Sequence, residues 1–206
     1  ASPRKLLAAC FNKLRLGQAE PPIGSSTACV ATLERHSGLL RIANLGDSGA
    51  FVIRAVDGEL ALESTVQQHK FNWPYQLMVP PVGETGGDPP EDADEYVVQV
   101  QEGDIVVLAT DGLFDNIPKD LLMTLTAALR SADLGAVAEE LVNIAHLRSQ
   151  SPEETPFSMR AQTAGVGHDG GKPDDITVIV ARVERSPPEA VEEDDEEEST
   201  SRGPQA

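Results

Sequence analysis

Three acidic turns contain the side chains of this sequence that are best suited to chemistry. Asp111 directly follows Thr110 at the end of the short apolar run 105–109, Asp47 also follows an apolar run, and Asp174 precedes one. Asp115 comes four residues after Asp111, so the two carboxylates face the same side if the chain turns into a helix there. Carboxylate oxygens are the ligands preferred by Mg²⁺ and Mn²⁺, and the lack of paired Cys or His ligands disfavours zinc.

The spacing of these turns is compatible with a single site. The three turns lie 64 and 63 residues apart in the sequence. In an antiparallel sheet the ends of two strands and the start of a third lie on one edge, where the carboxylates would converge. Two carboxylates about 4 Å apart repel by about 4 kcal/mol at an effective dielectric near 20, so a convergent cluster requires cations. Spacing alone nevertheless favours the alternative, three unrelated turns in an acidic protein.

Composition limits the classes of protein to which these turns belong. With 206 residues, of which 40% are hydrophobic, the chain supports one domain with a sizeable core. The net charge is −18, of which residues 186–206 contribute −7, so the rest is acidic as well. Such a surface repels nucleic acid and anionic membranes, and we expect no nucleic-acid partner. The segment 186–206 offers almost nothing to bury and is predicted to be a disordered acidic tail.

Cysteine usage and hydropathy indicate the environment. Cys10 and Cys29 lie in apolar patterns and are predicted to be core thiols of a protein in a reducing compartment. No apolar run approaches the roughly 18 residues that a membrane helix requires, so no membrane span is predicted.

The elements that must position the acidic turns follow from apolar periodicity and turn residues. A helix is predicted to begin after Ser2 and to end at Gly17. Four consecutive strands are predicted to form an antiparallel meander, and a later strand, 96–100, is predicted to pair with strand 105–109. The predicted meander strands are 24–33, 39–45, 50–55 and 59–62; two helices are predicted at 118–130 and 134–147, and a last strand at 176–183. Residues 63–95 and 149–173 are predicted to be irregular.

Four motifs occur in an order that identifies a family. The motifs are Gly24-Ser25-Ser26-Thr27-Ala28, Ala43-Asn44-Leu45-Gly46-Asp47-Ser48-Gly49, Ala109-Thr110-Asp111-Gly112-Leu113-Phe114-Asp115-Asn116 and Lys172-Pro173-Asp174-Asp175-Ile176-Thr177-Val178. Over about residues 5–183 the sequence resembles the metal-dependent type 2C (PPM) protein serine/threonine phosphatases. The stretch 67–77 is similar to the mitochondrial and organellar branch related to the T-cell-activation type 2C phosphatase.

The resemblance implies an α+β fold, a sandwich of two antiparallel β-sheets flanked by helices in αββα layers. It implies a phosphatase domain at 1–185, followed by the tail at 186–206. The implied reaction is hydrolysis of phosphoserine or phosphothreonine in a phosphoprotein by a metal-activated water. The resemblance further implies a protein that is monomeric when complete and located in the mitochondrial matrix or another organelle.

The resemblance also assigns the acidic residues. Asp111 and Asp174 match ligands of a centre that holds two Mg²⁺ or Mn²⁺ ions, and both are therefore the predicted catalytic residues. Asp47 and Asp115 match positions associated with a third, weaker metal.

One part of the family pattern is not found in this sequence. No stretch resembles Gly-Val-x-Asp-Gly-x-Gly-Gly, which in the family supplies the aspartate that bridges the metals, and no match to the family's phosphate-binding arginine precedes the first motif. We therefore expect a fold that is incomplete at its N-terminal side, and a chain that binds metal weakly and hydrolyses phosphoesters poorly.

The sequence leaves two other classes of function to consider. The first is a truncated or pseudo-phosphatase domain that acts as a binding module. The second is a serine protease with Ser48 as nucleophile and His36 as base, and it fails because too little chain precedes Ser48 for such a fold. Ser48 and His36 are instead predicted to be turn residues.

Overall fold

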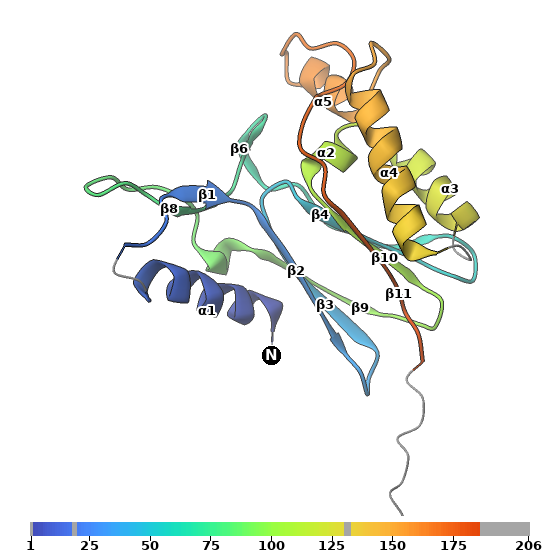
Figure 1. Ribbon diagram of the computed structural model, residues 1–206, viewed down its shortest axis with the longest axis horizontal. Coiled ribbons are helices and arrows are strands. Elements are labelled where there is room, and N and C mark those ends of the chain that lie inside the picture. The colour runs from blue at the N-terminus through green and yellow to red at the C-terminus, as the bar shows by residue number, and fades with distance from the viewer. Residues whose placement is uncertain (1, 18–19, 130–132, 186–206) are drawn as a thin grey trace, which may run out of the picture.

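The computed structural model describes residues 2–17, 20–129 and 133–185, and it consists of two facing antiparallel sheets with helices on both outer sides (Figure 1). The helices are α1 (Pro3–Leu16), α2 (Asp111–Phe114), α3 (Lys119–Leu129), α4 (Leu134–Ser149), α5 (Pro156–Thr163) and the 3₁₀ turn η1 (Pro90–Asp92). The strands are β1 (Gly24–Ser26), β2 (Ala28–Glu34), β3 (Leu39–Leu45), β4 (Gly49–Ile53), β5 (Leu60–Glu63), β6 (Gln68–Lys70), β7 (Trp73–Pro74), β8 (Leu77–Val79), β9 (Asp94–Gln99), β10 (Ile105–Ala109) and β11 (Val178–Arg182). The predicted fold class is confirmed.

The two large sheets have the orders β11-β10-β4-β5 and β2-β3-β9. Alternate side chains of their strands point to opposite faces, and this sorts the core into layers. In β10, Val106 packs between the sheets, whereas Val107 packs under α2, α3 and α4. In β3, Ile42 faces the other sheet and Leu45 packs toward α1. Each sheet is therefore buried on both faces at its centre.

Strand register brings the predicted acidic turns to one edge of the four-stranded sheet. Ala109, the last residue of β10, pairs with Gly49 of β4 on one side and with Val178 of β11 on the other. Because both pairings are antiparallel, the chain leaves β10 at the edge where it enters β4 and β11. The turns before β4 and β11 and the turn after β10 therefore meet.

Two predicted strand pairings are wrong. The meander is broken between β3 and β4, which belong to different sheets, and β9 pairs with β3 instead of β10. The chain crosses between sheets after β9 through a turn that is held by Asp104, whose buried carboxylate accepts hydrogen bonds from the backbone N–H groups of Ala55 and Gln101. Arg54 Nη1 lies 2.6 Å from the same carboxylate. A short turn between two apolar strands favours a hairpin locally, whereas the contacts of the buried Asp104 carboxylate hold this turn as a crossover.

Three further predictions need correction. Residues 63–95 contain the short strands β6, β7 and β8, and residues 149–173 contain α5. Cys10 is exposed on α1 and is not a core thiol, whereas Cys29 is half-buried and burial raises the pKa of its thiol to about 11.

The two helices predicted at 118–130 and 134–147 are observed as α3 and α4, and α1 is capped at Gly17 as predicted. The predicted tail at 186–206 lies outside the described residues. Within the described part of the chain, no helix combines the length and the apolar character needed to cross a membrane.

Candidate metal centre

Asp111 and Asp115 occupy the two ends of the short helix α2, directly after β10. The backbone N–H of Asp115 donates to the Asp111 carbonyl at 2.7 Å, and this helical turn places both carboxylates on the same side. Gly112 permits the turn, because a Cβ at this position would lie 2.5 Å from the Asp175 carbonyl oxygen. The Thr110 hydroxyl also donates to that carbonyl, which ties the end of β10 to the segment that opens β11.

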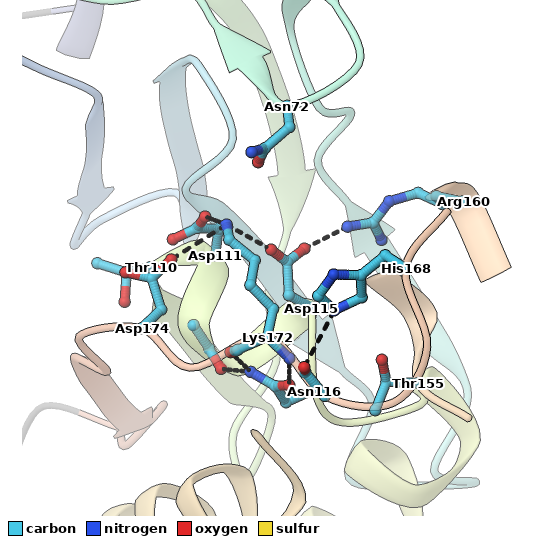
Figure 2. Close-up of polar contacts among 12 residues, drawn as sticks. Asn72, Thr110, Asp111, Asp115, Asn116, Thr155, Arg160, His168, Lys172 and Asp174 are labelled. Carbon is cyan, nitrogen blue, oxygen red and sulfur yellow. Dashed lines mark hydrogen bonds and ion pairs between the residues drawn. The ribbon is translucent and has the colours of Figure 1, made fainter. Parts of the chain in front are cut away.

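Three carboxylates surround one ammonium group (Figure 2). Lys172 Nζ lies 2.6 Å from Asp111 Oδ2, 2.9 Å from Asp115 Oδ2 and 3.0 Å from Asp174 Oδ2. The Lys172 side chain is only 17% exposed, and its Nζ lies 5.1 Å from the centre of the Phe157 ring. The described acidic cluster is therefore organised around a side chain that carries positive charge.

The backbone at Lys172 is fixed by Asn116, which is fully buried. The Asn116 amide accepts from Lys172 N–H and donates to Lys172 C=O, both at 2.9 Å, and it also donates to Gly112 C=O. One asparagine thus holds the α2 turn and the Lys172 segment together.

Electrostatics in the cluster reflects burial as much as charge. Desolvation, followed by repulsion from Asp111, raises the pKa of Asp47 to about 6. Desolvation also raises the pKa of Asp115, although Lys172 and Arg160 oppose this shift. Burial lowers the pKa of Lys172, but its hydrogen bonds to Asp111 and Asp115 outweigh burial, and the net pKa is raised. Burial and neighbouring negative charge therefore disfavour the ionised forms of Asp47 and Asp115.

Arg160 and Asn72 lie at the edge of the acidic cluster. Arg160, from α5, forms an ion pair with Asp115. Figure 2 shows Asn72 above the cluster, with its side chain directed toward the carboxylates. Asn72 has a φ of 53°, the only positive value at a non-glycine residue in the described part of the chain. Its neighbour Phe71 packs on Phe157 with ring centres 5.3 Å apart, which fixes the β6–β7 loop over the cluster.

An open groove of about 160 Å³ runs beside Asp47. Its lining includes the apolar side chains of Phe51, Val66 and Phe114, together with Lys119 and Arg160, which are ion-paired with Glu63 and Asp115. A side chain bound in this groove would lie next to the acidic cluster.

The structure thus brings together the residues predicted from sequence. Asp111, Asp115 and Asp174 meet at Lys172, and Asp47 lies near enough for Asp111 to raise its pKa. Their role as metal ligands stays a prediction. Sequence reasoning missed Lys172, Arg160 and Asn72, although Lys172 stands inside a motif and two residues before Asp174.

The residues fit a divalent cation in their chemistry, since the donors are carboxylate oxygens and three of them already converge on one positive charge. In this structure the three carboxylates are spaced by their contacts with the Lys172 ammonium group. Among the residues that the structure describes, no group of three or more His, Cys, Asp or Glu side chains is placed to hold a metal ion as it stands.

Comparisons with known proteins agree with this architecture. The family model described as "Stage II sporulation protein E (SpoIIE)" matches residues 1–184. The "Protein phosphatase PTC7 homolog fig" of Drosophila willistoni is 44% identical over 191 residues, which cover 88% of this chain and 60% of that protein. The protein of the same name in Drosophila melanogaster is 42% identical, with coverages of 89% and 60%. The chain spans about 60% of the length of these relatives.

Solved structures give the same result. The "X-ray structure of the photosystem II phosphatase PBCP" superposes with a TM-score of 0.77 at 33% identity, covering 89% of this chain and 72% of that one. The catalytic domain of the serine/threonine protein phosphatase PstP, solved with two manganese ions, shares the fold with a TM-score of 0.53 at 19% identity, covering 88% and 68%. With a family model matched over residues 1–184 and the 33% identity to a solved phosphatase, the chain belongs to the metal-dependent type 2C (PPM) phosphatase family, in the group described by the SpoIIE model.

Proposed function

We propose that the protein to which this chain belongs hydrolyses phosphoserine and phosphothreonine in phosphoproteins, and that it depends on Mg²⁺ or Mn²⁺. The observation that supports this proposal most strongly is that the carboxylates of Asp111, Asp115 and Asp174 converge on the Lys172 ammonium group at the edge of the sheet. The predicted ligands of two metal ions are Asp111 and Asp174, and Asp47 and Asp115 are the predicted ligands of a third ion that binds more weakly.

In this proposal the chain's own residues bind and orient. Bound divalent cations supply the charge that activates water and stabilises the phosphoryl oxygens during transfer. Asp111 and Asp174 hold the cations at the end of a rigid core strand, where their carboxylates are aimed by β10 and by the segment before β11. Asn116 keeps these two segments in register, and Arg160 orients Asp115.

The groove beside Asp47 supports a peptide substrate. Its apolar lining residues Phe51, Val66 and Phe114 suit a side chain next to the phosphorylated residue. We propose an organellar location from the resemblance of residues 67–77, and a monomer when the protein is complete.

A second candidate function is a binding module of the same family without activity of its own. The observation that favours it is the ion pairing of Lys172, which satisfies the cluster without metal. In this alternative the β6–β7 loop and the groove would bind a protein partner.

The test is metal-dependent dephosphorylation of a phosphothreonine peptide. It is run on this 206-residue chain and on an N-terminally extended version, each with Mn²⁺, with Mg²⁺ and with chelator. We expect Mn²⁺- or Mg²⁺-dependent phosphate release from the extended protein and much slower release from the chain alone. No metal-dependent release from either protein would favour the binding module.

A further inference from the structure

Lys172 lies among the carboxylates of Asp111, Asp115 and Asp174, where a cation held by Asp111 and Asp174 would have to lie. Its Nζ is within 3.0 Å of one oxygen from each carboxylate, and no other described basic side chain contacts all three. Figure 2 shows the side chain extending between Asp174 and Asp115 toward Asp111. Two positive groups cannot share such a position, because at contact distances they repel by several kcal/mol.

The position of Lys172 is built into the fold. Asn116 fixes the Lys172 backbone with two hydrogen bonds of 2.9 Å, and Phe157 lies against the ammonium group. The side chain is 17% exposed, in contrast to Lys119, which is 49% exposed in its ion pair with Glu63. A surface lysine samples many rotamers, whereas Lys172 is held in one by its surroundings.

We propose that Lys172 is an internal counter-ion that competes with divalent metal, so that a cation binds at Asp111 and Asp174 only when the Lys172 ammonium leaves the cluster. The carboxylates are then paired in both states, with the ammonium in one and with metal in the other. The apparent metal affinity equals the intrinsic affinity multiplied by the fraction of molecules in which the ammonium has left. Lys172 is thus a positioning residue that keeps the cluster assembled and lowers its metal affinity.

This inference rests on the metal site of the proposed function, but its test measures metal binding and lysine reactivity instead of turnover. A protein that binds Mn²⁺ by exchange with Lys172 and lacks phosphatase activity would support the inference and contradict the proposed function. An active protein whose Lys172 stays in place would do the reverse.

The first experiment uses the unmodified chain. Its lysines are acylated with an amine-reactive N-hydroxysuccinimide ester in chelator and in saturating Mn²⁺, and modification is measured for each lysine by mass spectrometry. We expect Lys172 to be protected in chelator and to become reactive in Mn²⁺, while Lys119 reacts equally in both. Calorimetric Mn²⁺ binding with Lys172 still protected would overturn the proposal.

The second experiment compares Lys172→Met with Lys119→Met, which removes a lysine at the surface. Calorimetry with Mn²⁺ should show that Lys172→Met binds about tenfold more tightly than the unmodified chain, and Lys119→Met should bind within about twofold. In chelator, Lys172→Met should have the lower melting temperature of the two, and Mn²⁺ should raise it by more. Equal or weaker Mn²⁺ affinity in Lys172→Met, or no binding by either the variant or the unmodified chain, would contradict competition.

Lys172→Arg covers the case in which the methionine variant does not fold. Arginine keeps the positive charge among the carboxylates, so its Mn²⁺ affinity should stay within about threefold of that of the unmodified chain. Tighter binding by a variant that retains the charge would show that the ammonium is not a competitor.

Discussion

At the scale of single residues, the proposed metal site depends on the contact between Asp111 and Lys172, whose Oδ2 and Nζ atoms lie 2.6 Å apart. An aspartate that follows a short β-branched run is visible because strands end at polar residues, so Asp111 was a candidate ligand from the start. The ion pair between Asp111 and Lys172 could not be predicted from the sequence, because the two residues are 61 positions apart and meet only through the pairing of β10 with β11. Sequence patterns are local, whereas this contact depends on strand register.

The first prediction concerns Asp111→Asn in the full-length protein. An amide keeps the shape of the side chain but loses the charge that holds a divalent cation, so phosphopeptide turnover should fall by more than about a hundredfold. Circular dichroism should show an unchanged fold. Asp175→Asn, at a neighbouring carboxyl group that does not contact Lys172, is the matched control and should retain most activity. Near-normal turnover of Asp111→Asn at saturating Mn²⁺ would remove Asp111 from the site.

The second prediction concerns Asp47→Asn in chelator. Because the pKa of Asp47 rises from 3.8 to about 6 on folding, the folded state holds this proton more tightly than the unfolded chain. Stability contributed by the protonated group is present below about pH 4 and is lost as the pH rises to about 6. The amide of Asp47→Asn does not ionise, so the variant does not lose this stability as the pH rises. Above pH 6 it should therefore be more stable than the unmodified chain by about 1–3 kcal/mol.

Urea unfolding at pH 4 and pH 7 measures the effect of Asp47→Asn. The difference from the unmodified chain should be small at pH 4 and largest at pH 7, and Asp169→Asn on an exposed loop should show no such trend. A variant that is less stable at pH 7 would mean that the Asp47 carboxylate is stabilised by contacts that outweigh its desolvation.

At the scale of elements, the helix α5 was missed and the helices α3 and α4 were found. Long apolar periodicity marks α3 and α4, whereas α5 has eight residues and lies in a stretch rich in turn residues. Its signal was local: Thr155 precedes Pro156, and the side chains of Thr155 and Ser158 form a reciprocal capping box. This element matters because it carries Phe157 and Arg160 to the acidic cluster.

The third prediction tests that cap. Thr155 is buried, its hydroxyl accepts from Ser158 N–H and donates to Gly170 C=O at 2.8 Å, and it therefore ties α5 to the loop before Lys172. Thr155→Ala should lower the free energy of unfolding by about 1–2 kcal/mol. Thr163→Ala, at the exposed end of the same helix, should change it by less than about 0.5 kcal/mol. Equal effects of the two substitutions in urea unfolding would show that the cap contributes nothing.

At the scale of the molecule, the layers were predictable and the strand order was not. The family motifs implied two antiparallel sheets with flanking helices, and the structure has them. Short turns between consecutive strands predicted hairpins, yet the chain crosses between sheets after β3 and after β9, and the crossing after β9 is held by the contact of Arg54 with Asp104. That contact joins residues 50 positions apart, beyond the reach of turn patterns.

The fourth prediction concerns residues 186–206, whose sequence has eight acidic residues and Val191 as its only large apolar residue. A segment with so little to bury contributes little to the stability of a domain. Deleting it should leave the melting temperature within about 1 °C of that of the intact chain, measured by calorimetry in chelator. A fall of several degrees would show that the segment packs on the domain, and repeating the scan at high salt would reveal whether charge holds it there.

We propose that the acidic edge of the four-stranded sheet is a divalent metal centre whose place is held by Lys172. Anomalous diffraction at the manganese edge, from crystals of this chain grown in Mn²⁺, tests this proposal. We expect an anomalous peak within about 2.0–2.2 Å of oxygens from Asp111 and Asp174, with Lys172 Nζ moved away from all three carboxylates. Crystals in which the Lys172 ion pairs are intact at saturating Mn²⁺ and no anomalous peak lies at Asp111 would contradict it.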